Sequence, residues 1–222
     1  MRQDMQSVPQ GGPVASGLVR PVLVSAVLFM AITGLGYPLV TTEVAELLFH
    51  HQAQGSIITE NGAAVGSELI GQPFIKPEHF HPRPSATTGT DPKDPSKTIA
   101  QPYNAANSGA TNLGPTSKQL VSDVTGRVEA YRTENGLGAN DPVPVDAVTA
   151  SASGLDPDIS IANARLQAKR VAAARGIPEE QVLALLDAHT QGPQYGVLGY
   201  PRVNVLELNI ALGTASPRAS TK

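Results

Sequence analysis

The 222-residue sequence contains no cysteine and no tryptophan, and only 4% of its residues are aromatic. Without cysteine, the chain can form neither a disulfide framework nor a thiolate metal or redox site. The formal net charge is −3 and the Lys and Arg residues are scattered. This argues against a nucleic-acid partner, which would require a clustered basic patch. The core must be built from Val, Leu, Ile and Ala.

Several catalytic motifs are also missing. No Gly-Lys dipeptide occurs, so there is no P-loop, and 136–138 (GLG) lacks the third glycine of a dinucleotide fingerprint. There is no Gly-x-Ser-x-Gly elbow, no His-Glu-x-x-His zinc motif, and no Asp-Lys-Thr-Gly motif of a phosphorylated P-type ATPase. These absences favour an accessory or binding domain over a free-standing enzyme.

Charge is absent from one long stretch, Pro21 to Thr42, which lies between Arg20 and Glu43. As an α-helix its 22 residues would be about 33 Å long, enough to cross the roughly 30 Å hydrocarbon core of a bilayer. We expect a single transmembrane helix over 20–42, preceded by a disordered tail over 1–19. A cleaved signal peptide and a buried helix of a soluble domain are the alternatives, but the apolar run is long for the first and lacks the polar stripe of the second.

The charges beside this stretch predict its orientation. Arg2 and Arg20 lie on its N-terminal side, whereas four glutamates precede Lys76, the first basic residue on the other side. Because Lys and Arg near a span are retained in the cytoplasm, the N-terminus is expected inside and residues 43–213 outside. We therefore predict a single-pass protein of a bacterial inner membrane with a periplasmic or extracellular domain.

Small residues lie near the outer end of the span. Gly34 and Gly36 would let a neighbouring helix approach closely, and Pro38 removes one backbone donor and could kink the helix. We expect Gly34, Gly36 and Pro38 to pack against a partner helix in the bilayer. The alternative is that Gly and Pro are simply common in membrane helices.

The rest of the sequence predicts a single α+β domain over 43–213. Asn61-Gly62 is a strong hairpin signal, residues 116–119 (TSKQ) are a capping-box start, Ser160 is a candidate helix N-cap, and Gly136 and Gly176 are candidate stops. The first residues, 43–51, are expected to continue the membrane helix outward. The other expected elements are a β-hairpin over 55–70, a long loop over 71–117, helices over 117–135, 160–175 and 178–189, strands over 144–150 and 206–212, and a loose tail over 214–222.

Histidines and acids occur in two places where a metal site could be considered. His50 and His51 are adjacent, so on a helix they would point about 100° apart. Glu78, His79 and His81 lie among prolines that enforce extended backbone, and no second ligand cluster accompanies them. A solvated helix end is the favoured interpretation for the first pair and ordinary loop packing for the second group, so no metal site is expected.

Long motifs nevertheless carry a resemblance. The sequence resembles the C subunit family of bacterial potassium-transporting ATPases (KdpC) over about residues 20–213. Two departures are visible: Pro82 stands where Gly is expected, and Ile161-Ala162 replaces a Pro-containing pair. The motifs are TGLGYPL at 33–39, RPSA at 83–86, PYNAANSGATNLGP at 102–115, VTASASGLDPDIS at 148–160 and GVLGYPRVNVLELNIAL at 196–212.

The resemblance implies a non-catalytic subunit of a high-affinity potassium uptake complex. Its partners would be a channel-like A subunit, a P-type ATPase B subunit that hydrolyses ATP, and a small F peptide. The C subunit would stabilise the complex and act as a catalytic chaperone that raises the ATP affinity of the B subunit.

In this family a Gln helps to contact nucleotide, and it maps to Gln167. No tightly bound cofactor is implied, because ATP would be met only through the complex. An ordinary surface glutamine is the alternative for Gln167. A physical alternative for the domain is that it caps the exterior ion entrance of the A subunit. From another class, the rival is a membrane-tethered exterior solute-binding or sensor module.

Overall fold

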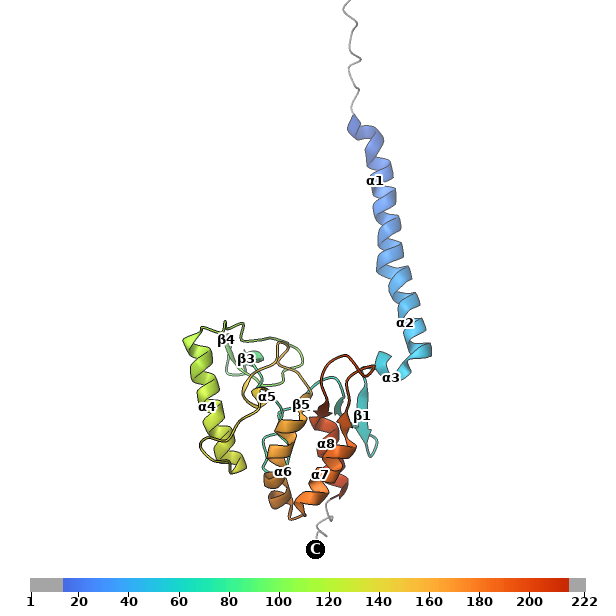
Figure 1. The fold of residues 1–222 in the computed structure, drawn as a ribbon. Helices are drawn as coiled ribbons and strands as arrows, with labels where there is room; N and C mark the ends of the chain where they lie inside the picture. The colour runs from blue at the N-terminus through green and yellow to red at the C-terminus, as the bar shows by residue number, and fades with distance from the viewer. Residues whose placement is uncertain (1–13, 216–222) are drawn as a thin grey trace, which may run out of the picture. The chain divides into compact units, whose positions relative to one another are not determined.

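The structure, a computed structural model, describes residues 14–215. These form two compact units, one that ends at Gly55 and one that begins at Ser56 (Figure 1). The first is a long apolar helix and the second mixes helices with short antiparallel strands. This confirms the expected fold class, an N-terminal transmembrane helix followed by a single α+β domain.

The first unit is helical almost throughout. It consists of α1 (Val14–Ala31), a π-helical turn η1 (Ile32–Gly36), α2 (Tyr37–Leu48) and the short α3 (His50–Ala53). In the described part of the chain, Gly17–Leu48 is the one helical stretch long and apolar enough to cross a membrane, and none of it is buried inside the structure. Because α1 begins at Val14, residues 14–19 are helical and do not belong to a disordered tail; residues 1–13 lie outside the described part.

The outward extension of this helix stops earlier than expected. Phe49 leaves the helical region, with φ −138° and ψ 49°, so α2 ends at Leu48 and His50 starts a separate turn. His50 Nδ1 lies 2.9 Å from the Glu46 carboxylate four residues earlier, an exposed pair of little energetic value.

Two β-hairpins follow. The expected one is confirmed as β1 (Ile57–Glu60) and β2 (Ala63–Ser67), joined by Asn61-Gly62 with both residues at positive φ. The second, β3 (Thr88–Asp91) with β4 (Asp94–Ala100), lies inside the region that we expected to be a loop, 71–117. The loop expectation is wrong there because these strands are polar and largely exposed, so they lack the alternation of apolar residues that marks a half-buried strand.

The three expected helices of the domain are confirmed. They are α4 (Lys118–Asn135), α6 (Ile161–Arg175) and α7 (Glu179–Ala188). The side chains of Ser117 and Ser160 accept hydrogen bonds from backbone amides of the first turns of α4 and α6, and Gly136 and Gly176 end these helices at φ 64° and 66°. Local capping chemistry therefore sets both ends of each helix.

The strand expected over 144–150 is wrong. After Pro144 the chain makes a single helical turn, α5 (Val145–Val148). The Asp146 carboxylate explains the turn, because it accepts hydrogen bonds at 2.8 Å from both the backbone N–H and the side-chain hydroxyl of Ser160. A tertiary contact thus overrides the strand preference of a short Val-rich segment.

The strand expected over 206–212 is also wrong, because these residues lie in α8 (Val205–Ala215). Asn204 caps this helix, since its Oδ1 accepts from the amides of Leu206 and Glu207. The alternating apolar residues wrongly predicted a strand because α8 is buried on almost all sides. Its core residues are Val205, Leu206, Leu208 and Leu212. The helix also takes in residues 214 and 215 of the expected tail; residues 216–222 lie outside the described part.

A small sheet and the C-terminal helices hold the core. Strands β5 (Asp158–Ser160), β7 (Arg202–Asn204) and β6 (Thr190–Gln191) form an antiparallel sheet in the order β5-β7-β6. Helix α6 contacts α4 on one side and α7 on the other, and α7 also contacts α8 (Figure 1). The buried apolar cluster comes from β5, β7, α6, α7 and α8 together with one residue of the long loop, Phe80.

Candidate functional site

A polar stripe runs along the buried face of α6. The Ser160 cap starts this helix so that Asn163, Gln167 and Arg170 follow at helical spacing, three or four residues apart. Asn163 and Gln167 are each only 1% exposed. A buried amide without a hydrogen-bond partner would destabilise the fold. The partners of these side chains therefore show which role the polar stripe has in the domain.

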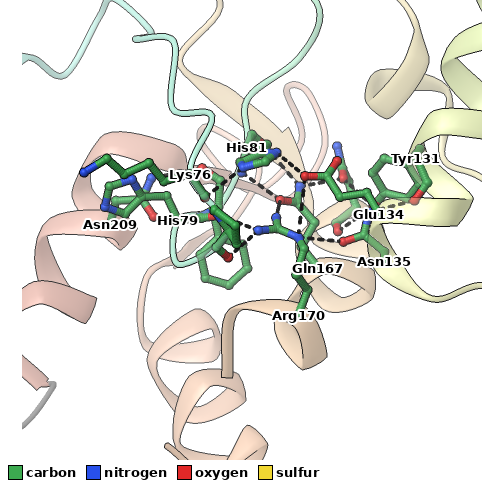
Figure 2. Close-up of polar contacts among 12 residues, drawn as sticks. Lys76, His79, His81, Tyr131, Glu134, Asn135, Gln167, Arg170 and Asn209 are labelled. Atoms are coloured by element: carbon green, nitrogen blue, oxygen red, sulfur yellow. Dashed lines mark hydrogen bonds and ion pairs between the residues drawn. The ribbon is translucent and has the colours of Figure 1, made fainter. Parts of the chain in front are cut away.

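Gln167 uses every hydrogen-bonding position of its side-chain amide. Its Oε1 accepts from the His81 backbone N–H at 2.7 Å and from Arg170 Nη2 at 2.8 Å. Its Nε2 donates to the His81 carbonyl at 3.1 Å and to Asn163 Oδ1 at 2.9 Å. Figure 2 shows the amide enclosed between the chain at His81 and the guanidinium of Arg170.

The alternative of a surface glutamine is therefore wrong, since Gln167 is buried. The contact with a nucleotide implied by the family resemblance stays a prediction. In this structure the amide has no donor or acceptor left over for such a ligand, because an amide offers two N–H groups and two lone pairs. A nucleotide would have to displace one of the present partners of the amide, which are the His81 backbone, Arg170 and Asn163.

Side chains from α6 and α8 hold the backbone of residues 77–81, the clamped segment, in the same way. Asn209 of α8 pairs with Phe80 as Gln167 pairs with His81, accepting from its N–H at 2.8 Å and donating to its carbonyl at 3.0 Å. Five consecutive carbonyls accept from side chains: those of Pro77 and His79 from Arg170, that of Glu78 from Arg175, that of Phe80 from Asn209 and that of His81 from Gln167.

The clamped segment has no regular secondary structure, so these side chains replace the hydrogen bonds of a sheet. Unpaired, each buried backbone group would cost about 1–3 kcal/mol. The clamp also fixes the position of Phe80, whose ring is 0% exposed within the core cluster. A proline-rich loop is thereby made part of the rigid domain.

His81 extends the clamp to α4. Its Nδ1 lies 2.9 Å from the Glu134 carboxylate, and its Nε2 lies 2.9 Å from the Lys76 carbonyl (Figure 2). This hydrogen bond from His81 lowers the pKa of the Glu134 carboxyl. The His79 ring instead stands edge-on to Phe74, with ring centroids 5.3 Å apart. Across residues 14–215, no three His, Asp or Glu side chains gather as a metal site.

A cavity of about 320 Å³ lies beside Gln167, between α4 and the chain that follows the clamped segment. Its apolar walls include Pro82, Pro84 and Tyr103. The cations that line it already face acceptors: Arg83 pairs with Asp156 at 2.7 Å, and Arg127 donates to the Val148 carbonyl at 3.1 Å. The Arg83 Nε is buried without a partner, at a cost of about 1–3 kcal/mol.

The residues around the cavity have a structural role. The phenol of Tyr103 donates to the Arg83 carbonyl at 2.7 Å, and that of Tyr131 donates to Asn163 Oδ1 at 2.8 Å. Ser85 is likewise engaged, donating to the Gly154 carbonyl. The charge of Arg83 is already paired with Asp156 and several of the cavity walls are apolar, so the cavity does not fit a triphosphate, and we assign no chemical step to it.

We predict that the domain loses stability as the pH rises above about 10. Burial raises the pKa of Tyr103 and of Tyr131 above the ordinary tyrosine value. Their stabilising contribution is present below pH 10, the pKa in the unfolded chain, and is lost as pH rises above it, at up to about 1.4 kcal/mol per pH unit for each tyrosine. Urea titrations of the full chain in detergent at pH 9, 10 and 11 measure the slope.

The matched variant for this prediction is Tyr131→Phe, which keeps the ring and removes the ionising hydroxyl. Its free energy of unfolding should be lower at pH 8 but should fall less steeply with pH than that of the wild-type chain. Parallel curves for the two proteins would show that Tyr131 is not held neutral by the fold.

The membrane unit holds the other candidate residues, Gly34, Gly36 and Pro38. The two glycines lie in η1, and Pro38 follows at the start of α2. A Cβ at Gly34 would meet no atom within 4 Å, and one at Gly36 only the Ala31 carbonyl at 3.7 Å, so both positions are open within the chain. The π-helical turn was not foreseen; such turns are frequent at functional positions.

Sequence reasoning missed Asn163, Arg170, Arg175 and Asn209. Their signal was present but weak, because each polar residue occurs at helical spacing beside buried apolar positions of α6 or α8. In the expected helix over 160–175 the pattern does not say which backbone a polar residue binds, and Asn209 was expected on the polar face of a strand.

Residues 19–214 match the model of a family described as KdpC, K+-transporting ATPase, c chain. A protein of Rhodopseudomonas palustris named potassium-transporting ATPase KdpC subunit is 55% identical over 200 residues, covering 90% of this chain and 98% of that protein. A protein of the same name from Bradyrhizobium diazoefficiens is 52% identical over 200 residues, covering 90% of this chain and 98% of that protein. Another, from Methylobacterium nodulans, is 54% identical over 194 residues, covering 87% of this chain and 95% of that protein.

Proposed function

Since this chain belongs to the KdpC family, the C chains of potassium-transporting ATPases, we propose that it is a non-catalytic accessory subunit that stabilises a high-affinity potassium uptake complex. The observation that carries this proposal is a match over nine-tenths of the chain to proteins named as subunits of that ATPase. ATP hydrolysis then belongs to another subunit. The absence of catalytic motifs from the sequence agrees with this division of labour.

The partners in this proposal are a channel-like A subunit, a P-type ATPase B subunit and a small F peptide, together with the lipid bilayer. The chain crosses a bacterial inner membrane once, with its N-terminus in the cytoplasm and the domain outside. The apolar helix supports the anchoring, because none of it is covered by the chain itself. The flanking charges support the orientation.

The same proposal includes a catalytic chaperone that raises the ATP affinity of the B subunit. We place its action at a distance, with the exterior domain capping the ion entrance and favouring the complex conformation that binds ATP. The saturated Gln167 amide supports an indirect effect over a direct contact with nucleotide. A ligand can shift such an equilibrium only through its differential affinity for the two states.

This proposal is tested by affinity purification of the full chain from native membranes. Recovery with two large membrane subunits, and an ATP Kd that is lower when the chain is present, are the expected results. By linkage, ATP should tighten retention of the chain by the same factor. Recovery without large subunits would instead favour the solute-binding or sensor module. ATP turnover by the isolated full chain, after removal of contaminating ATPases, would overturn the non-catalytic role.

We predict that a single cysteine at position 216 is labelled in intact cells by a membrane-impermeant reagent, whereas one at position 7 is not. The reason is the retention of positive charge on the cytoplasmic side. Because the chain lacks native cysteine, each variant reports one position. Labelling of position 7 but not of 216 would reverse the proposed topology.

We also predict that Gly34→Leu with Gly36→Leu leaves membrane insertion intact but weakens assembly with the channel-like subunit. Association in lipid relies on close van der Waals contact, and such contacts contribute about 1–2 kcal/mol or less, so co-purification in detergent should fall up to about tenfold. The matched control is Val24→Leu with Val27→Leu, elsewhere in the span. Normal co-purification and normal potassium-limited growth of the glycine variant would exclude this packing role.

A further inference from the structure

The loop between β6 and β7 exposes a concentrated apolar surface. Within residues 192–201 (GPQYGVLGYP), the uncharged tip, Tyr195 is 85% exposed, Val197 80% and Tyr200 88%, and Leu198 is also exposed. The other large exposed apolar side chains of the domain are spread singly over different elements. Isolated exposed apolar residues need no explanation, but a group of four in six residues indicates a binding surface.

The uncharged tip is a built structure. Gln194 and Leu198 form an antiparallel bridge, with N···O distances of 2.8 and 2.9 Å in the two directions. Tyr195 and Gly196 make the turn, with φ 54° and 77°. A left-handed backbone is costly for a bulky residue, and such conformations concentrate at functional sites. Here the turn holds the Tyr195 ring in solvent.

The base of the tip is fixed to the core. Pro201 leads into β7, the central strand of the sheet, where Val203 is fully buried. The adjacent Arg202 is paired with Asp158 at 2.8 Å. The apolar side chains are therefore presented by a rigid support, which lowers the entropy lost on binding.

From this geometry we propose that the uncharged tip is a docking anchor that inserts Tyr195 and Tyr200 into an uncharged, apolar recess on a partner protein. The inference rests on the proposed function, because the partner is another subunit of the potassium-transporting ATPase. Tyrosine is enriched at the centre of protein interfaces and charged residues are depleted there, which is the composition of the tip.

The absence of charged residues from the tip favours a protein partner over a lipid surface. Amphipathic helices that lie on a membrane surface carry Lys and Arg beside their apolar residues. The tip has none, and residues 56–215 hold 12 Lys and Arg against 16 Asp and Glu, so the domain as a whole is acidic. A self-contained interface needs roughly 20–30 residues per side, more than this tip provides. A membrane tether compensates, because it raises the effective concentration of the tip near other membrane subunits.

The test places a photo-crosslinking phenylalanine analogue at Tyr195 or at Tyr200 of the full chain, expressed with the rest of the complex in native membranes. The matched control is Val145, an exposed apolar residue of α5. We expect adducts with a second protein subunit at yields at least tenfold above the control. Adducts with lipid only, adducts with a second copy of this chain, or yields equal to the control would each overturn the proposal.

A second measurement uses Tyr195→Ser with Tyr200→Ser. Both rings are exposed, so thermal melting of the chain should not change, whereas the chain should leave the detergent-purified complex at least tenfold faster. Unchanged retention would overturn the docking role while leaving the accessory function intact. Failure of the wild-type chain to co-purify would instead overturn the proposed function itself.

Discussion

Replacement of Gln167 by Ala is expected to lower the free energy of unfolding of the domain by about 4 kcal/mol. The change removes the partners of the His81 N–H and carbonyl and the acceptor of Arg170 Nη2, whereas Asn163 Oδ1 keeps its hydrogen bond from Tyr131. Each buried group left unsatisfied costs about 1–3 kcal/mol, and water in the new space recovers part of the loss. For a chain of this length the melting temperature should fall by roughly 10 °C.

The measurement is urea and thermal denaturation of the full chain in detergent, followed by far-ultraviolet circular dichroism. Gln181→Ala, at an exposed position of α7, is the matched control and should change stability by less than about 0.5 kcal/mol. Gln167→Glu should also destabilise, because a carboxylate accepts hydrogen bonds but cannot donate to the His81 carbonyl.

The Gln167→Ala variant also distinguishes a structural role of Gln167 from a direct contact with nucleotide. Well below its melting temperature, a complex that retains the Gln167→Ala chain should bind ATP within about twofold of the wild-type affinity, because the exterior domain is still folded. A stable Gln167→Ala chain in a complex with much weakened ATP binding would show instead that Gln167 meets nucleotide directly.

Replacement of Phe80 by Ala is expected to cost about 4 kcal/mol as well, through the cavity that it leaves. The ring is fully buried among the residues of α6, α8 and the sheet, and large-to-small changes of this kind cost about 3–5 kcal/mol. Ile75→Ala, at an exposed position of the same loop, is the control and should have little effect. The same denaturation experiment measures both, and a Phe80→Ala chain as stable as the control would mean that the loop is not part of the core.

A double variant tests whether Phe80 and Asn209 are energetically coupled. Asn209 holds both backbone groups of Phe80 while the ring packs in the core, so Asn209→Ala and Phe80→Ala remove two different contacts of the same residue. Their effects should depart from additivity by about 0.5 kcal/mol or more, as is usual for residues in contact. Additive effects in the double variant would show that the ring is positioned by packing alone.

Predictions that rest on a few neighbouring residues were confirmed. The span followed from an uncharged run, the first hairpin from Asn61-Gly62, and the ends of α6 from a serine cap and a glycine stop. The start of α4 followed from the capping-box pattern at 116–119, although the cap is Ser117 and not Thr116. The family followed from ordered motifs along the chain. The orientation in the membrane, the partner-packing role of Gly34 and Gly36 and the contact of Gln167 with nucleotide remain predictions.

Expectations failed where the deciding contact was remote or where the pattern had two solutions. An alternating apolar run suits a strand, yet 206–212 is helical because neighbouring elements cover α8 on nearly every side. The segment 144–150 turns helically because Asp146 meets Ser160. The strands of the hairpin β3–β4 are polar and mostly exposed, so the sequence has no alternation of apolar residues there that would predict them.

By itself, the sequence determined the membrane helix, the capped helices and the family, because capping, turn chemistry and uncharged length act over a few residues. Only the tertiary structure decided that Gln167 is a buried clamp and that a proline-rich loop belongs to the core. The bonds concerned join Gln167 to a residue 86 positions away and Asn209 to one 129 positions away. A side-chain amide can bind any backbone that reaches it, and which one does so depends on how the whole chain packs.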